Sequence, residues 1–225
     1  MAVYPAGNEA FLAPNVITPQ HYNVYAGRSQ DAAIDTAALQ WAVAQAVAAG
    51  NGTVYLGSGD YLINDSIGEL ITSPISIIGD GQAQCRIFMD VGMSGDAISF
   101  RNCWYGADVT NLEGGGTGVG TGDVESWPSR TSRKSGVVLK GFALVGSRAT
   151  VQTQNGIVFY DRNDAVLMRD IDIHCIKGYG LVLSGIPSNP GSNAASVMRE
   201  SHIENVHLRW CGDHTTARPA VVFNS

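Results

Sequence analysis

Aspartate, histidine and arginine side chains alternate with apolar residues in two short runs of the sequence. In "RDIDIHC", Asp172 and His174 alternate with isoleucines, and in "NVHLRW", His207 and Arg209 alternate with valine and leucine. A strand places alternate residues on opposite faces, so the polar members of each run share one face. If the two runs are neighbouring strands about 4.8 Å apart, the four side chains form one patch of acid–base groups.

Such a patch can serve two kinds of chemistry on sugar polymers. Hydrolysis of a glycosidic bond needs two carboxylates, about 5–5.5 Å apart for retention or about 6.5–9.5 Å for inversion. Asp172 has no carboxylate at the matching place in the other run, so the second carboxylate would have to come across a turn, from Glu204, Asp161 or Asp170, or from another subunit. Elimination from a uronic-acid polymer needs a base and a cation, roles that Arg209 or a histidine fits. The alternative is an ordinary solvated strand face.

Aromatic side chains that can stack on sugar rings are found at two places. Trp210 closes the second run, while Trp104, Tyr105 and Trp127 belong to the stretch 101–135, which has no strand pattern. Their flat faces match pyranose rings, so we predict that these four residues bind substrate. Packing within the loop is the alternative for the three residues of that stretch.

No metal site is predicted from the cysteines and histidines. Cys175, Cys211, His174 and His214 match no standard zinc spacing, and the four cysteines contain no CxxC pair. We therefore expect no resident cofactor. If the chemistry is an elimination, Asp172 would either bind Ca²⁺ or orient a histidine.

The composition favours many short strands over a helical bundle. The chain has 225 residues, of which 44% are hydrophobic, 15% are charged and 27 are glycine. Low charge and frequent glycine suit strands joined by tight turns. The net charge of −6 argues against binding to nucleic-acid phosphates. The start "MAVYPAGNEAFLAP" lacks the pattern of a secretory signal, and no apolar run reaches the ~20 residues of a membrane span, so we expect a protein made in the cytoplasm that does not bind membranes.

One helix is expected, at about 36–49 within "DTAALQWAVAQAVAAG". Asp35 or Thr36 can cap its first amides, the alanines supply helix propensity, and Gly50 can take the left-handed conformation that ends it. The apolar residues fall on one face, so the helix can pack against a layer of strands.

Strand-like runs recur after this helix at irregular intervals. They are 53–56, 61–63, 75–79, 85–89, 97–100, 137–146, 156–160, 166–175, 180–184, 201–210 and 220–224. Three of the longer runs superimpose without a gap, which places Phe142, Ile171 and Val206 in one inward column. Recurring strands with loops of varied length are typical of a solenoid of stacked coils. The helix would then cover the open end of the first coil.

A second column points to an interface between subunits. Val158, Val182 and Val222 hold equivalent places in three coils, and we expect them to face outward. An exposed apolar stripe along a solenoid usually marks a contact, and packing of a terminal segment on it is the alternative.

Together, these features resemble the right-handed parallel β-helix proteins of the pectate-lyase-like superfamily, and most closely its phage tailspikes and capsule depolymerases. The resemblance rests on "DAAIDTAALQWAVAQAVAAGNGTVYLGSGDYLI" (31–63) and on "ISIIGDGQ" (75–82). The usual Gly-Asp-Gly before the helix is replaced by "GRSQD", and the usual Pro-x-Gly turn reads "GSG". Both departures are turn positions. The rest of the chain matches by its strand pattern alone.

The resemblance implies an all-β, right-handed, single-stranded parallel β-helix capped by the N-terminal helix. We expect a lead-in segment at 1–30 and the β-helix domain at 31–225, truncated at its C-terminal end or covered there by another subunit. The implied function is that of a tailspike module that binds and cleaves a bacterial surface polysaccharide, as a homotrimer in the phage virion. Two alternatives stay open, a non-catalytic structural or adhesive virion module and a free-standing bacterial polysaccharide lyase or hydrolase.

Overall fold

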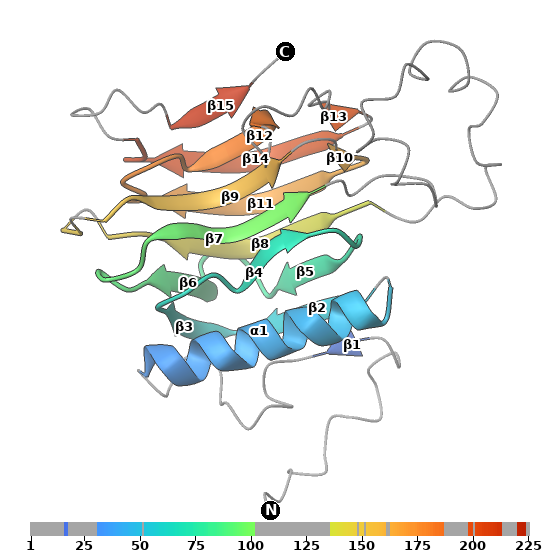
Figure 1. The fold of residues 1–225 in the computed structure, drawn as a ribbon, viewed down its shortest axis with the longest axis horizontal. Helices are drawn as coiled ribbons and strands as arrows, with labels where there is room; N and C mark the ends of the chain where they lie inside the picture. The colour runs from blue at the N-terminus through green and yellow to red at the C-terminus, as the bar shows by residue number, and fades with distance from the viewer. Residues whose placement is uncertain are drawn as a thin grey trace, which may run out of the picture.

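The computed structural model of the chain describes residues 16–17, 31–50, 52–101, 136–147, 149–150, 152–160, 163–186, 198–199, 201–212 and 220–223. Within this part of the chain, parallel strands stack as successive coils, and a helix lies across one end of the stack (Figure 1). The predicted fold, an all-β right-handed parallel β-helix with an N-terminal capping helix, is confirmed.

The strands match every run expected from the sequence. The elements are β1 (Val16–Ile17), α1 (Ala32–Ala48), β2 (Thr53–Gly57), β3 (Gly59–Ile63), β4 (Gly68–Ile71), β5 (Ser76–Gly79), β6 (Cys85–Met89), β7 (Gly95–Arg101), β8 (Val138–Val145), β9 (Gln154–Tyr160), β10 (Asn163–Asp164), β11 (Leu167–His174), β12 (Leu181–Ile186), β13 (Met198–Arg199), β14 (His202–Arg209) and β15 (Val221–Phe223). Strands β1, β4, β10 and β13 were not expected, and each has four residues or fewer.

Helix α1 begins earlier than predicted, because Asp31 caps it rather than Asp35 or Thr36. The Asp31 carboxylate accepts hydrogen bonds from two amides of the first turn, at 3.0 and 3.4 Å. Asp35 and Thr36 lie in the first turns of the helix, and both side chains are buried. Asp35 binds a residue of β3, and Thr36 binds the residue that follows β3. Asp35 accepts a hydrogen bond from the Leu62 amide at 2.9 Å, and Thr36 accepts one from the Asn64 amide at 3.0 Å. These two residues therefore fasten the helix to the first coil.

The helix covers the open end of the core, as predicted. Leu39 and Ala46 are fully buried against the first coil. A Cβ atom at Gly52 would lie 2.5 Å from the Cα atom of Ala46, so only glycine lets β2 start so close to the helix. Gly50, with φ of +74°, ends the helix in the left-handed conformation that was expected. Among the described residues, no helix is long and apolar enough to cross a membrane.

Two parallel sheets form the walls of the solenoid (Figure 1). The first, sheet A, runs in the order β1-β2-β5-β8-β11-β14, and β3 and β6 join it through β8. The second, sheet B, runs in the order β15-β12-β9-β7-β4. Each of β6, β8, β11 and β14 is followed along the chain by β7, β9, β12 and β15 respectively, so one corner of the solenoid repeats in every coil.

Sheet A bends at a single residue in each of its three long strands. Gly141 (φ +71°), Asp170 (φ +54°) and Asn205 (φ +52°) hold the equivalent place in β8, β11 and β14. Glycine, aspartate and asparagine are the residues that best tolerate this left-handed conformation. The Asn205 side-chain amide also donates to the Asp170 carboxylate at 2.7 Å, which links two neighbouring bends.

The register of the long strands is the one predicted. Ile171 pairs with Phe142 on one side and with Val206 on the other. Phe142 and Ile171 are buried in the core, while Val206 on the last long strand is half-buried. Phe100 and Phe159 stack across sheet B with ring centroids 5.1 Å apart, so both sheets contribute to one core.

The second column, Val158–Val182–Val222, has the predicted register but not the predicted exposure. Val158 and Val182 are 1% and 0% exposed, and Val222 is half-buried. The chain itself covers this column, so Val158 and Val182 do not form the exposed stripe that was expected to contact another subunit.

Candidate functional site

The structure brings the four predicted acid–base residues of sheet A together. Asp172 lies directly opposite His207, and His174 lies directly opposite Arg209, on the neighbouring strands β11 and β14. The position equivalent to Asp172 on β8 is Ala143, and the column continues through Arg86 on β6 to Asp60 on β3, so the nearest carboxylate in register is three strands away. The four residues therefore lie together as predicted, and their catalytic role stays a prediction.

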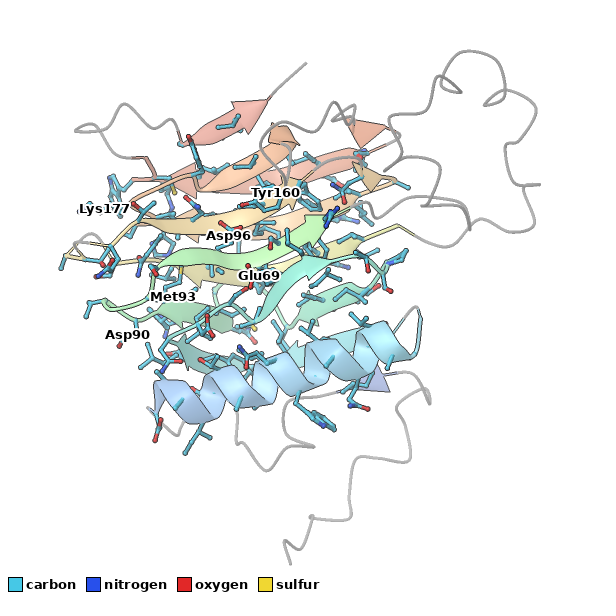
Figure 2. All side chains as sticks on the ribbon, in the orientation of Figure 1. Glu69, Asp90, Met93, Asp96, Tyr160 and Lys177 are labelled. Atoms are coloured by element: carbon cyan, nitrogen blue, oxygen red, sulfur yellow. The ribbon has the colours of Figure 1, made fainter. Side chains whose placement is uncertain are left out.

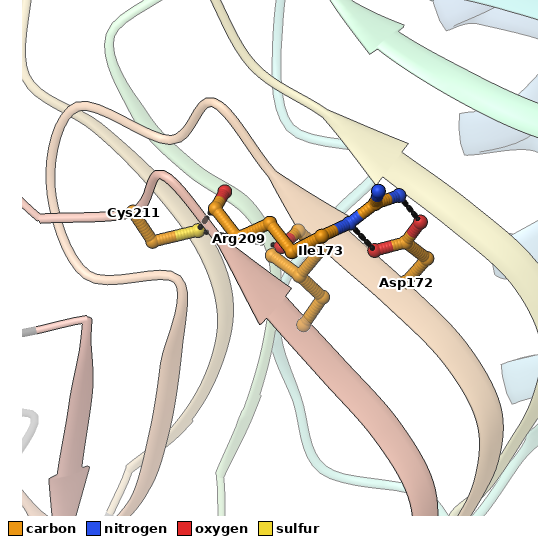
Figure 3. A network of polar contacts seen from close by, with 4 residues as sticks. All are labelled: Asp172, Ile173, Arg209 and Cys211. Atoms are coloured by element: carbon orange, nitrogen blue, oxygen red, sulfur yellow. Dashed lines mark hydrogen bonds and ion pairs between the residues drawn. The ribbon is translucent and has the colours of Figure 1, made fainter.

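Asp172 forms an ion pair with Arg209. The Arg209 guanidinium donates two hydrogen bonds to the Asp172 carboxylate, from Nε to Oδ1 at 3.3 Å and from Nη2 to Oδ2 (Figure 3). The Asp172 side chain is 12% exposed, whereas that of Arg209 is 54% exposed. The hydrogen bond that Arg209 donates to Asp172, and the negative charge of Asp172, raise the pKa of Arg209. A carboxylate held in this way is poorly placed to act as a nucleophile or base.

The two histidines of the patch differ in their surroundings. His174 is half-buried, and its Nδ1 atom is buried without a hydrogen-bond partner among the described residues. His207 is exposed on β14. Neither makes an ion pair or hydrogen bond with Asp172 in the part of the chain that the structure describes.

Of the four aromatic residues predicted to bind sugar, one can be placed. Trp210 follows β14 directly and is 66% exposed. Trp104, Tyr105 and Trp127 lie outside the described residues. Cys211, considered for zinc, donates from its thiol to the carbonyl oxygens of Ile173 (3.4 Å) and Arg209 (3.5 Å) (Figure 3). Within the described ranges, no three His, Cys, Asp or Glu residues are grouped as a metal site would require.

A second cluster, which was not predicted, lies on sheet B around Asp96. Asp96 at the start of β7 pairs in register with Asn155 on β9. Its Oδ1 atom accepts a hydrogen bond from the Asn155 side-chain amide at 2.8 Å, and its Oδ2 atom accepts one from the Tyr160 hydroxyl at 2.8 Å. Asn155 is itself fixed, because its Oδ1 atom accepts a hydrogen bond from the Tyr179 amide at 3.1 Å. Neutral donors therefore hold both oxygens of this carboxylate.

The direction of the Tyr160 side chain follows from the register. Tyr160 pairs with Arg101 at the far end of β7, yet its hydroxyl reaches Asp96 at the near end. Because the preceding Phe159 points into the core, Tyr160 points to the opposite face of β9. Its hydrogen bond to Asp96 therefore joins the two ends of the paired strands β7 and β9.

Glu69 on β4 is the second carboxylate of this cluster (Figure 2). It is exposed and lies next to Leu70, whose amide donates to the Ser99 hydroxyl of β7 at 2.9 Å. Burial raises the pKa of Tyr160, and the charges of Asp96 and Glu69 raise it further. Both carboxylates thus act on one phenol, which stays protonated well above neutral pH.

Sequence reasoning missed this cluster because the run 97–100 was not aligned with the later coils. Aligning it with 156–160 would have set Asp96 beside Asn155, and that was the available signal. The contact of Tyr160 with Asp96 could not be found in this way, because the two residues are five register positions apart.

Comparison with known proteins gives likenesses of structure alone. No protein-family model matches the sequence, and no curated protein matches it. The ORF18 protein of Geobacillus virus E2 is similar in structure, with 13% identity and a TM-score of 0.47 over 75% of this chain. The A-module of the mannuronan C-5 epimerase AlgE4 of Azotobacter vinelandii is similar with 18% identity and a TM-score of 0.47 over 87% of this chain. The matches cover 28% of the phage protein and 50% of the epimerase module.

Proposed function

We propose that the chain is a β-helix module of a phage tailspike that binds a bacterial surface polysaccharide and hydrolyses its glycosidic bonds on the outer face of sheet B. The observation that carries the proposal is the hydrogen bond from the Tyr160 hydroxyl to Asp96 on β7, with a second carboxylate, Glu69, on the neighbouring strand β4. Two carboxylates near one bond are what glycoside hydrolysis requires. The stacked strands also give a long, regular surface, which suits a polymer.

In the proposed reaction, the Asp96 carboxylate takes a proton from a water molecule while the water oxygen bonds to the anomeric carbon. The bond between that carbon and the glycosidic oxygen breaks, and its electron pair stays on the oxygen. Glu69, in its protonated form, donates a proton to this oxygen. One water molecule is consumed, and one reducing end and one hydroxyl group are formed.

Tyr160 and Asn155 act in this proposal as positioning residues. Each donates one hydrogen bond to one oxygen of Asp96, so the carboxylate cannot rotate away from the bond that reacts. Because the pKa of Tyr160 is raised, the phenol remains a donor at neutral pH and does not serve as the base.

The test is incubation of the protein with capsular, exopolysaccharide and pectic polymers, followed by measurement of new reducing ends. We expect reducing ends from at least one polymer, and their loss in Glu69→Gln. Reducing ends accompanied by the ultraviolet absorbance of unsaturated uronate would show elimination and overturn the hydrolytic mechanism. The absence of any product across the panel would favour the non-catalytic virion module.

The homotrimer and the place in the virion belong to the same proposal. The burial of Val158 and Val182 removes the surface that was expected to hold the trimer together, so its interface must lie elsewhere. Sedimentation or light scattering in solution tests the subunit number. A monomer would contradict the tailspike and favour a free-standing polysaccharide-degrading enzyme.

A further inference from the structure

The guanidinium of Arg209 is anchored on one edge and open on the other. Nε and Nη2 donate to Asp172, which leaves the Nη1 group without a partner among the described residues (Figure 3). A guanidinium has five N–H donors in a rigid plane, so two held donors fix the direction of the rest. Since the side chain is 54% exposed, this open edge faces solvent.

The negative partner of Arg209 is hidden from that surface. Asp172 is 12% exposed, so a ligand approaching from solvent meets N–H donors before it meets the carboxylate. Glu204, the carboxylate on the same strand, lies on the other side of the bend at Asn205 and contacts Arg169 at 3.4 Å and His202 at 3.6 Å. The exposed His207, opposite Asp172, adds a further side chain that can donate a hydrogen bond.

An exposed indole follows this guanidinium directly. Trp210 has φ of +53°, and Cys175 at the end of the preceding long strand has φ of +61°, so the backbone is left-handed at this place in two successive coils. Bulky side chains rarely adopt this conformation, and glycine or asparagine is the usual choice. The chain carries tryptophan here with 66% of it exposed, which offers a flat ring for the face of a sugar.

This pair of residues lies along the same corner of the solenoid as Asp96. The chain passes from β14 to β15 just after Trp210, and from β6 to β7 just before Asp96 (Figure 1). Strands β7, β9, β12 and β15 are successive neighbours in sheet B, so three spacings of about 4.8 Å separate the two levels, or about 14 Å. One polymer chain lying along the solenoid axis can reach both.

We propose that Arg209 and Trp210 form a recognition site for a sugar that carries a carboxylate, the indole stacking on the ring and the Nη1 edge binding the carboxylate. This inference rests on the proposed polysaccharide function and names its substrate class as an acidic polymer. A planar guanidinium recognises a carboxylate in a fixed orientation, which a lysine ammonium cannot reproduce.

The test is binding of three polymers, measured by affinity electrophoresis and calorimetry: polygalacturonate, its carboxyl-reduced counterpart and dextran sulfate. We expect wild type to bind polygalacturonate and to bind the reduced polymer on the order of tenfold more weakly. Arg209→Lys and Trp210→Ala should each weaken binding of polygalacturonate to a similar extent. Arg86→Lys is the matched control, because Arg86 is also exposed and also paired with an aspartate, Asp60, on sheet A.

The outcomes separate this inference from the proposed hydrolysis. Asp96→Asn should bind polygalacturonate as wild type does, even where it no longer produces reducing ends. Equal binding of the native and carboxyl-reduced polymers, or an Arg209→Lys variant that binds like Arg86→Lys, would overturn the inference. Tighter binding of dextran sulfate than of polygalacturonate would overturn the assignment to carboxylates. Binding that depends on Arg209 without any cleavage would support this site and contradict the hydrolytic function.

Discussion

Asp172 on sheet A and Asp96 on sheet B are both held by two hydrogen bonds, and the donors differ in charge. Asp172 is bound by a guanidinium, which neutralises it, and its side chain is largely hidden. Asp96 is bound by a phenol and an amide, two neutral donors that orient it without neutralising its charge. A carboxylate bound by a cation is suited to holding that cation in place, whereas one bound by neutral groups can still accept a proton.

The two aspartates therefore have different roles, although both are polar residues at the start of or within a strand. In sheet A, Asp172 holds the guanidinium of Arg209 in place, and the free edge of that guanidinium is the part proposed to bind a ligand. In sheet B, Tyr160 and Asn155 hold the carboxylate of Asp96 in place. Substitutions in the two regions should therefore have different effects on cleavage and on stability.

The largest effect is expected from Asp96→Asn, which should reduce the release of reducing ends by about 10²–10⁴-fold, because it removes the proposed base. Asp172→Asn, the matched change on sheet A, should leave the rate of cleavage close to that of wild type. Rates of product formation at saturating polymer measure both. A loss of activity in Asp172→Asn with retention in Asp96→Asn would reverse the assignment.

Truncation of the core beneath each site should destabilise the whole molecule. Phe159→Ala removes the ring stacked on Phe100 and should cost about 3–5 kcal/mol, and Ile173→Ala beneath sheet A should cost about 2–5 kcal/mol. Denaturant unfolding, followed by circular dichroism, gives both values. Because the two sheets share one core, we expect a single transition. Two separate transitions would show that the regions unfold independently.

Tyr160→Phe should have a smaller and pH-dependent effect. Loss of the hydrogen bond to Asp96 should cost about 0.5–1.5 kcal/mol at neutral pH. Since the pKa of Tyr160 is raised, its contribution to stability is complete below about pH 10, where an unfolded tyrosine also keeps its proton, and is lost as the pH rises through the raised pKa. Unfolding free energies from neutral to alkaline pH should therefore fall more steeply for wild type than for Tyr160→Phe. Parallel curves would contradict this.

The smallest effects are expected from the two ion pairs of sheet A. Asp172→Asn and Asp60→Asn should each lower the thermal midpoint slightly, with the larger shift for Asp172 because its side chain is 12% exposed against 41% for Asp60. Both shifts should shrink at high salt. A decrease of the thermal midpoint in Asp172→Asn as large as that in Phe159→Ala would show that the Asp172–Arg209 ion pair mainly stabilises the fold.

Much of the solenoid could be predicted because its signals are local. Apolar alternation marks the long strands, and the absence of gaps between them sets Ile171 beside Phe142 and Val206. The same register is enough to predict that Asp172, His174, His207 and Arg209 lie together. The helix was found from its alanine-rich face, although Asp31 caps it where Asp35 or Thr36 was expected, because several polar residues compete for that position.

What could not be predicted depends on side chains that act across the fold. Val158 and Val182 were expected to be exposed and are buried, and Tyr160 reaches Asp96 from the far end of the paired strand. The ion pair of Asp172 with Arg209 is likewise diagonal, since Arg209 sits opposite His174 in register. The register predicts which residues are backbone neighbours, whereas long side chains can contact residues that are not paired with them in register.

The left-handed positions Gly141, Asp170 and Asn205 have a consequence for how this molecule tolerates new sequence. A bend made by one residue leaves no room for an added one, since an insertion there would shift half of a long strand out of register. The passages from β7 to β8 and from β12 to β14 already differ widely in length along the chain. Foreign peptides inserted after Arg101 or Ile186 should therefore leave the coils intact. The β-helix is then a scaffold that tolerates insertions after β7 and β12 but not at the left-handed positions within sheet A.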